Sequence, residues 1–329
     1  MVQISISTNV DLQNYKKRID SVCKLMSPEG IEIFSLPYNY PNKFYSQLEE
    51  KHESKFPVLS KSLALEIGKK LRKNRIKKVQ FHYPWQKHPL DMNGSDINFT
   101  IQFCDLVLEE SGAEQLTINY HNSFKHYPDK LKKLNSEFRK NLLNSFELQT
   151  QIMKDIRDEL DSECLLNVEN NPAVALIKDS NGNLVQDIVD QVSEDFINRK
   201  WIDGITFDYS HAWLVMEYFR RNEQKFANME LCRKQYGGVP NSAKSMNNFV
   251  KSVASRIKWI HLSDEVHPYQ HEGLHIGEGK IDFNECAELL KKYLKKDVVV
   301  TIEVLDGHTP EGYKKIVEKD FPLLKELLS

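Results

Sequence analysis

The stretch Leu165-Leu166-Asn167-Val168-Glu169 is a short apolar run that ends on a carboxylate. Short runs rich in aliphatic, β-branched and aromatic residues are typical of buried β-strands. Five more runs have this form and end on a side chain that can bind a metal ion; they cover residues 79–82, 116–121, 205–208, 257–261 and 298–303. Polar side chains at the carboxyl ends of successive strands are the pattern of an active site at the mouth of an α/β barrel. The pattern therefore favours a metalloenzyme.

Two further apolar runs, residues 2–7 and 31–35, bring the number of expected strands to eight. Between the strands, apolar residues recur at helical spacing in residues 60–75, 97–110, 138–160, 188–196, 247–257 and 286–294. Strict alternation of strand and helix predicts a parallel sheet, and eight repeats predict its closure into a barrel. We therefore expect a single (β/α)8 TIM barrel domain over residues 1–329, with extended loops on its C-terminal face. Residues 209–247 are expected to form one of these loops.

Charge and cysteine content restrict the partners. Lys and Arg total 45 against 47 Asp and Glu, so the net charge of -2 gives no overall field for nucleic acid. This balance disfavours nucleic acid as a partner without excluding it. The five cysteines include no Cys-x-x-Cys pair and are typical of reduced thiols. We find neither a signal-peptide pattern nor an apolar stretch of about 20 residues, and we expect a cytoplasmic protein with no membrane partner. A homo-oligomer is left open.

Three carboxylates end apolar runs: Glu169, Asp208 and Glu303. A buried carboxylate without a partner is costly, so a cation or a basic side chain must compensate each one. Taken singly, each could instead bind nearby backbone or a buried lysine. Taken together with His261, which ends another run, they favour a shared divalent cation.

Three more histidines are candidate ligands. His82 and His121 end neighbouring expected strands, and His211 follows Asp208 by three residues. A single histidine near a sheet is more often a hydrogen-bonded core residue than a ligand. We favour the ligand role for His82 and His121 because they face the same mouth as the carboxylates.

A glycine-rich segment follows the seventh expected strand. It contains Gly277 and Gly279, preceded by His271 and His275. A Gly-x-Gly pair mostly marks a turn, but after the seventh strand of a barrel its amides can face a phosphate or a substrate hydroxyl. We expect these four residues to contribute to substrate binding.

The order of these segments resembles the xylose-isomerase-like TIM barrel superfamily, which includes sugar isomerases, sugar epimerases and AP endonucleases of the endonuclease IV type. The matching segments are Phe81-His82-Tyr83-Pro84, Tyr120-His121, Val168-Glu169-Asn170, Asp208-Tyr209-Ser210-His211, His261-Leu262-Ser263-Asp264, Gly277-Glu278-Gly279-Lys280-Ile281-Asp282-Phe283 and Ile302-Glu303. They cover nearly the whole chain. The set is specific for the superfamily and does not select the reaction.

Resemblance to the epimerases implies one divalent metal, usually manganese, cobalt or magnesium. The ligands carried over are Glu169, Asp208, His261 and Glu303. The metal would polarise a substrate carbonyl and hydroxyl. Glu169 and Glu303 would be the catalytic residues, exchanging a proton at the adjacent carbon through an enediolate.

Resemblance to endonuclease IV implies three zinc ions instead. His82 and His121 would join Glu169 at one ion, and Glu169 would bridge to a second ion held by the epimerase ligands. His211 would hold a third, together with an Asp-x-His pair shortly before the Gly-x-Gly segment.

The sequence departs from the endonuclease pattern at that pair, because His271 and Gly273 stand at the expected Asp and His positions. The densest basic run, residues 69–78, precedes the third strand and is expected at the bottom of the barrel, away from DNA bound at the mouth. The first hypothesis is therefore a sugar or sugar-phosphate isomerase or epimerase with a small carbohydrate substrate and one to three divalent ions (Mn, Mg, Co or Zn). The alternative is a multinuclear zinc phosphodiesterase or AP endonuclease. A third reading is a metal-stabilised scaffold without catalytic activity.

Overall fold

The computed structural model describes residues 3–9, 15–26, 30–34, 60–83, 94–121, 136–160, 164–171, 176–178, 184–186, 193–196, 202–221, 237–266, 273–295, 297–307 and 309–329. Within them, eight strands close into a barrel in which all neighbours run parallel. The strands in spatial order are β1 (Gln3–Asn9), β10 (Val299–Ile302), β9 (Ile257–Leu262), β8 (Gly204–Asp208), β5 (Cys164–Glu169), β4 (Gln115–His121), β3 (Lys78–His82) and β2 (Gly30–Phe34). The predicted (β/α)8 barrel is confirmed.

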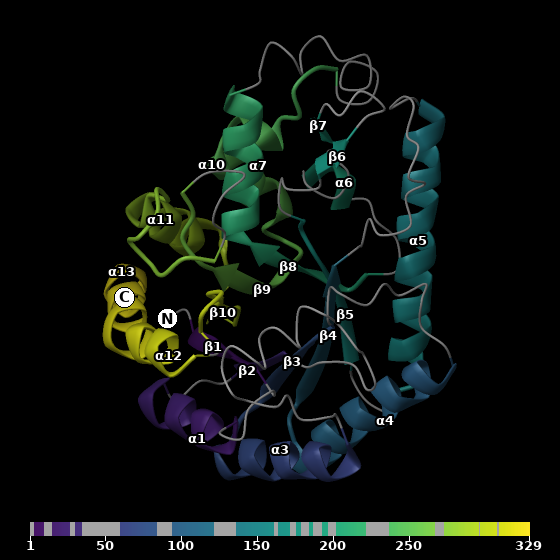
Figure 1. The fold of residues 1–329 in the computed structure, drawn as a ribbon, viewed down its shortest axis with the longest axis vertical. Coiled ribbons are helices and arrows are strands. Elements are labelled where there is room, and N and C mark those ends of the chain that lie inside the picture. Colours follow the sequence, from purple (N-terminus) through teal and green to yellow (C-terminus); the bar gives the residue numbers. More distant parts are fainter. Residues whose placement is uncertain are drawn as a thin grey trace.

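Helices surround the strands (Figure 1). They are α1 (Tyr15–Met26), α3 (Lys61–Lys73), α4 (Gly94–Ser111), α5 (Ser136–Asp158), α6 (Ser193–Phe196), α7 (Tyr209–Arg221), α10 (Met246–Val253), α11 (Phe283–Tyr293), α12 (Pro310–Lys315) and α13 (Phe321–Leu328). A 3-10 turn, Ser242–Lys244, precedes α10, and a π-helical turn, Ile316–Asp320, joins α12 to α13. A two-stranded antiparallel hairpin, β6 (Leu176–Lys178) and β7 (Leu184–Gln186), follows β5.

The prediction of a loop over residues 209–247 is wrong for residues 209–221, because α7 begins directly after β8. Its apolar residues, which include Ala212, Trp213 and Leu214, are buried. Among the helices of the described residues, none combines the length and the apolar character that crossing a membrane requires.

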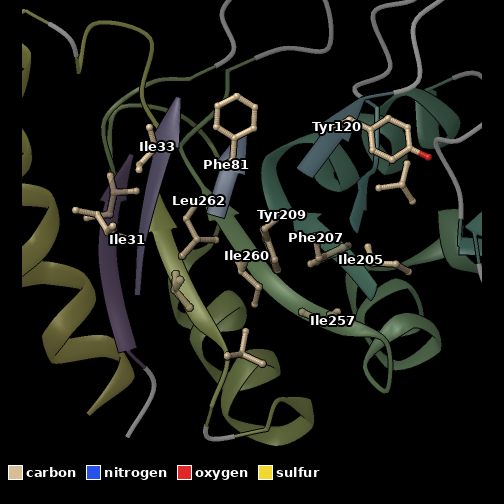
Figure 2. Packing of buried hydrophobic residues seen from close by; sticks show 14 of the residues in the cluster. Ile31, Ile33, Phe81, Tyr120, Ile205, Phe207, Tyr209, Ile257, Ile260 and Leu262 are labelled. Carbon is tan, nitrogen blue, oxygen red and sulfur yellow. The ribbon is translucent and has the colours of Figure 1, made fainter. Parts of the chain in front are cut away.

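Side chains alternate along each strand between two different environments. On β3, Val79 and Phe81 join the hydrophobic core outside the barrel, where the ring centroid of Phe81 lies 5.7 Å from that of Phe103 on α4. Figure 2 shows Phe81 among the packed side chains of this core. The alternate residues of β3, Gln80 and His82, are also buried, but they contact polar groups of other strands across the barrel. The barrel interior therefore contains a polar layer below its mouth.

Candidate metal centre

The carboxyl ends of the strands bring the predicted ligands together. Within the described residues, two groups of side chains offer ligand atoms that all lie within 4.8 Å of one another. One group is His82, Glu169, His261 and Glu303, and the other is Glu169, Asp208 and His211. The tetrad expected from the epimerase resemblance is thus divided between two groups that share Glu169.

Glu169 lies at the centre of the site. Its Oε2 accepts a hydrogen bond from Asn119 Nδ2 (2.6 Å) and faces His82 Nε2 at 3.2 Å and His121 Nε2 at 3.4 Å. Its Oε1 lies 3.0 Å from His261 Nδ1. The two oxygens of one carboxylate therefore face different histidines, which is the arrangement of a carboxylate able to bridge two cations.

Three histidines are held with one ring nitrogen turned toward the carboxylates. His82 Nδ1 donates to the carbonyl oxygen of the next residue (3.0 Å), and His211 Nδ1 donates to the Asn170 carbonyl oxygen (2.9 Å). His121 Nδ1 lies 3.2 Å from Asn171 Oδ1. Because each Nδ1 has an acceptor on its outer side, the Nε2 lone pair is left for the centre of the site. Metal-binding histidines are commonly oriented in this way.

His261 is oriented from the opposite ring nitrogen. Its Nδ1 lies 2.7 Å from Glu303 Oε2 and 3.0 Å from Glu169 Oε1, while its Nε2 lies 2.5 Å from Glu32 Oε2. Glu32 lies on β2 and is fully buried. Our sequence reasoning missed this residue, although a glutamate inside the apolar run Ile31-Glu32-Ile33 is a signal that could have found it.

Asp208 is fixed by hydrogen bonds to the Asn170 side chain and to the His211 backbone amide. Asn170 Nδ2 donates to the Asp208 carbonyl oxygen, and the Asp208 amide donates to Asn170 Oδ1, both at 2.8 Å. Asp208 Oδ1 accepts the backbone amide of His211 (2.8 Å) in the first turn of α7, while Oδ2 lies 3.6 Å from His211 Nε2. One aspartate therefore caps a helix and offers an oxygen to the site.

The charges of the cluster fit a divalent cation. Within the described part of the chain, the ion pairs of Glu169, Asp208 and Glu303 are all with histidines. A neutral histidine offers no positive charge to balance a carboxylate, and three carboxylates close together, two of them buried, repel one another. Carboxylate and imidazole donors without a lysine or arginine are ligand types of divalent-metal sites.

The pKa values of these groups follow from burial and from their mutual contacts. Burial raises the pKa of Asp208 to about 6 although His211 opposes the shift, and burial lowers the pKa of His121 to about 4. Burial also opposes protonation of His82, but the hydrogen bond and charge of Glu169 outweigh it and raise the pKa of His82 to about 9. Burial opposes ionisation of Glu169, yet the surrounding histidines hold its pKa well below its ordinary value. Without a metal, protons on the histidines therefore balance part of the carboxylate charge.

The glycine-rich segment is held by an internal carboxylate. The Asp264 side chain is fully buried, and its Oδ2 accepts the backbone amides of Gly277 and Gly279, each at 2.8 Å. Asp264 Oδ1 accepts the amides of Glu265 (2.8 Å) and Ile281 (3.0 Å). The two glycine amides that we predicted to face a substrate are thus already bound, and we do not carry them into the proposed substrate site.

Of the two histidines of that segment, His275 is described by the structure and His271 lies outside the described residues. His275 is buried, with Nδ1 2.6 Å from Asp320 Oδ2 and Nε2 2.8 Å from Asp306 Oδ1. The Asp306 contact is a close approach outside hydrogen-bond geometry. His275 therefore ties the loop after β9 to the C-terminal helices, and its predicted role in substrate binding gains no support from these contacts.

Comparison with known proteins matches no family model and no curated protein. Solved structures do match over nearly the whole chain. A D-tagatose 3-epimerase-like protein is 18% identical with a TM-score of 0.50, covering 100% of both chains. A xylose isomerase domain protein from Planctomyces limnophilus is 12% identical with a TM-score of 0.55, covering 99% of this chain and 97% of its own. Endonuclease IV from Thermus thermophilus is 13% identical with a TM-score of 0.57, covering 99% of this chain and 98% of its own. The chain therefore has the fold of the xylose-isomerase-like TIM barrels.

Proposed function

We propose that the chain is a divalent-metal-dependent sugar or sugar-phosphate isomerase or epimerase. The observation that carries this proposal is the convergence of Glu169 and Glu303 on one nitrogen of His261, at 3.0 and 2.7 Å. The side chain of Glu303 is 31% exposed, whereas that of Glu169 is 1% exposed. A substrate that enters the mouth therefore meets Glu303 first.

Glu169, Asp208, His261 and Glu303 would hold the metal, as the epimerase resemblance implies, with His82 as a further donor beside them. When bound, the metal would polarise carbonyl and hydroxyl oxygens of a sugar. Glu303 would then remove or return a proton at the carbon next to the carbonyl, and Glu169 would do so from the other side. Two carboxylates are needed because an epimerase must deliver the proton to the opposite face of a planar carbon. The fold similarity to a D-tagatose 3-epimerase-like protein supports this choice of chemistry.

The test is Glu303→Gln, measured by exchange of the substrate proton with D2O across a panel of ketoses and their phosphates. We expect a loss of about 100-fold or more, because general acid–base groups typically contribute that much. Fold, by circular dichroism, should be unchanged. The control is Glu278→Gln, since that glutamate is equally exposed at 32% and forms ion pairs only with Lys315 and Lys319 among the described residues. Full activity in Glu303→Gln would refute the proton-transfer role.

A second candidate function, a multinuclear metal phosphodiesterase, is favoured by one specific contact set. Glu169 Oε2 faces His82 and His121, while Oε1 faces His261, so the donors suffice for two cations that share Glu169. Elemental analysis of the purified protein separates the two functions. About three zinc ions per chain, with cleavage of a duplex that contains an abasic site, would replace the epimerase proposal; one exchangeable manganese, cobalt or magnesium would support it.

A further inference from the structure

The polar layer inside the barrel holds a carboxylate directly beneath the candidate metal centre. Glu32 is fully buried on β2, and its Oε2 accepts hydrogen bonds from His261 Nε2 (2.5 Å) and Gln80 Nε2 (2.6 Å). A buried carboxylate is costly unless hydrogen bonds and charge compensate it. Its position on the far side of the imidazole from Glu303 indicates that its role concerns His261.

The support for Glu32 extends across the barrel. Gln80 Oε1 accepts a hydrogen bond from Thr206 Oγ1, and Thr206 Oγ1 accepts one from Asn167 Nδ2, both at 3.2 Å. Side chains from β5, β8 and β3 thus form a chain that ends on Glu32. The hydrogen bond from Thr206 holds the Gln80 amide with its oxygen toward Thr206 and its NH2 group toward Glu32. This donor fixes the Glu32 carboxylate in place.

The position of the single proton on a neutral His261 decides whether the residue can bind a cation. Glu169 and Glu303 both lie within 3.0 Å of Nδ1 and favour a proton there. A proton on Nδ1 would occupy the lone pair that a metal needs. Glu32 is the opposing acceptor: a carboxylate only accepts, so it favours the proton on Nε2 and leaves Nδ1 free.

We propose that Glu32 is a positioning residue that holds His261 in the orientation and tautomer able to bind a divalent cation through Nδ1. His82 and His211 are oriented by backbone carbonyl oxygens. His121 is oriented by an amide side chain. Of these four histidines, His261 has an anionic orienting partner because it is the one whose metal-facing nitrogen lies between two carboxylates. The inference rests on the metal site of the proposed function.

The test is isothermal titration of the metal-free protein with MnCl2 and with ZnCl2. Replacing the outer partner of a metal-binding histidine typically weakens metal affinity 10- to 100-fold. We expect a loss of that size for Glu32→Leu and a smaller loss for Glu32→Gln, whose amide oxygen still accepts from Nε2. The matched control is Thr117→Val, which alters a buried residue of β4, two strands away from β2, whose hydroxyl accepts from Gln115. Its metal affinity should equal that of the wild type.

Two further measurements separate positioning from folding. Gln80→Leu leaves Glu32 in place and removes both the hydrogen bond to Glu32 and the 3.2 Å contact of Gln80 Nε2 with His261 Nε2, so it should weaken metal binding less than Glu32→Leu does. In ¹⁵N-histidine spectra of the zinc-loaded protein, His261 should carry its proton on Nε2, and this signal should be lost or shifted in Glu32→Leu. Wild-type affinity and an unchanged His261 signal in the Glu32 and Gln80 variants would overturn this inference alone. A wild-type protein that binds neither ion would overturn it together with the proposed function.

Discussion

Replacing Asp264 by Asn should destabilise the fold even though the change affects only one atom. Asp264 Oδ1 and Oδ2 each accept two backbone amides, from Glu265 and Ile281 and from Gly277 and Gly279, at 2.8 to 3.0 Å. In asparagine one of these oxygens becomes an NH2 group, which cannot accept. Two amide N–H groups, either the buried pair of Glu265 and Ile281 or the part-buried pair of Gly277 and Gly279, then face another donor.

The cost follows from the number of amides that lose an acceptor. An unsatisfied buried donor costs about 1–3 kcal/mol, so two of them give about 2–6 kcal/mol. The control is Asp282→Asn at the N-cap of α11. There a single oxygen, Asp282 Oδ1, accepts both amides, from Asn284 (2.9 Å) and Glu285 (3.2 Å). Asparagine keeps that oxygen and caps helices as well as aspartate, so the control should change stability by less than about 0.5 kcal/mol.

Urea unfolding of both variants in EDTA measures the difference, provided that the slope of the unfolding free energy against urea concentration stays the same. If Asp264→Asn costs no more than Asp282→Asn, the carboxylate does not hold the glycine segment as the structure shows. The glycine amides would then again be candidates for a substrate phosphate.

Two other predictions concern stability: its dependence on pH and its response to alanine at Gly277 and Gly279. Because the pKa of folded His82 is raised from 6.5 to about 9, its protonation contributes stability that is complete below pH 6.5 and is lost as the pH rises through 9. The unfolding free energy of the metal-free protein should fall by up to about 3 kcal/mol over that range. The stabilisation by added Mn²⁺ should increase over the same range, because metal binding needs a neutral imidazole. A urea midpoint in EDTA that stays constant with pH would contradict the first expectation. Gly279→Ala should destabilise more than Gly277→Ala, because a Cβ at residue 279 would lie 2.3 Å from the Glu265 carbonyl oxygen, whereas at residue 277 it meets nothing within 4 Å and adds only the strain of φ +81°. Equal urea midpoints for the two variants would argue against that packing.

The barrel was predictable because its strands carry a strong local signal. Val79 and Phe81 face the outer helices, and apolar residues at such positions made all eight strands recognisable. The clustering of the candidate ligands was predictable for the related reason that each strand ends at the mouth. How the ligands divide into two groups around Glu169 was not predictable, because that depends on side-chain rotamers set by partners from other strands, such as Asn119 and Asn170.

The missed features depend on contacts between residues far apart in the chain. Glu32 is 229 residues from His261, and neither position identifies the other. Asp264 is 13 residues from Gly277, so the sequence indicated a turn able to hold an anion but not that the anion is the protein's own carboxylate. The start of α7 was missed because residues 209–247 were assigned as a whole to a loop, although Asp208 caps a helix.

Glu169 connects the two candidate reactions, and the number of cations it binds would decide between them. If Oε1 binds a cation beside His261 and Oε2 binds another beside His82 and His121, both oxygens are occupied and Glu169 has little capacity to exchange a proton. With a single cation on the Oε1 side, Oε2 keeps the hydrogen bond from Asn119 and stays close to His82. Under the proposed function, proton exchange would then depend on Glu303, the more exposed carboxylate, and on the basicity that the Asn119 hydrogen bond leaves to Oε2. The number of metal ions bound would therefore select the chemistry that this set of side chains can perform.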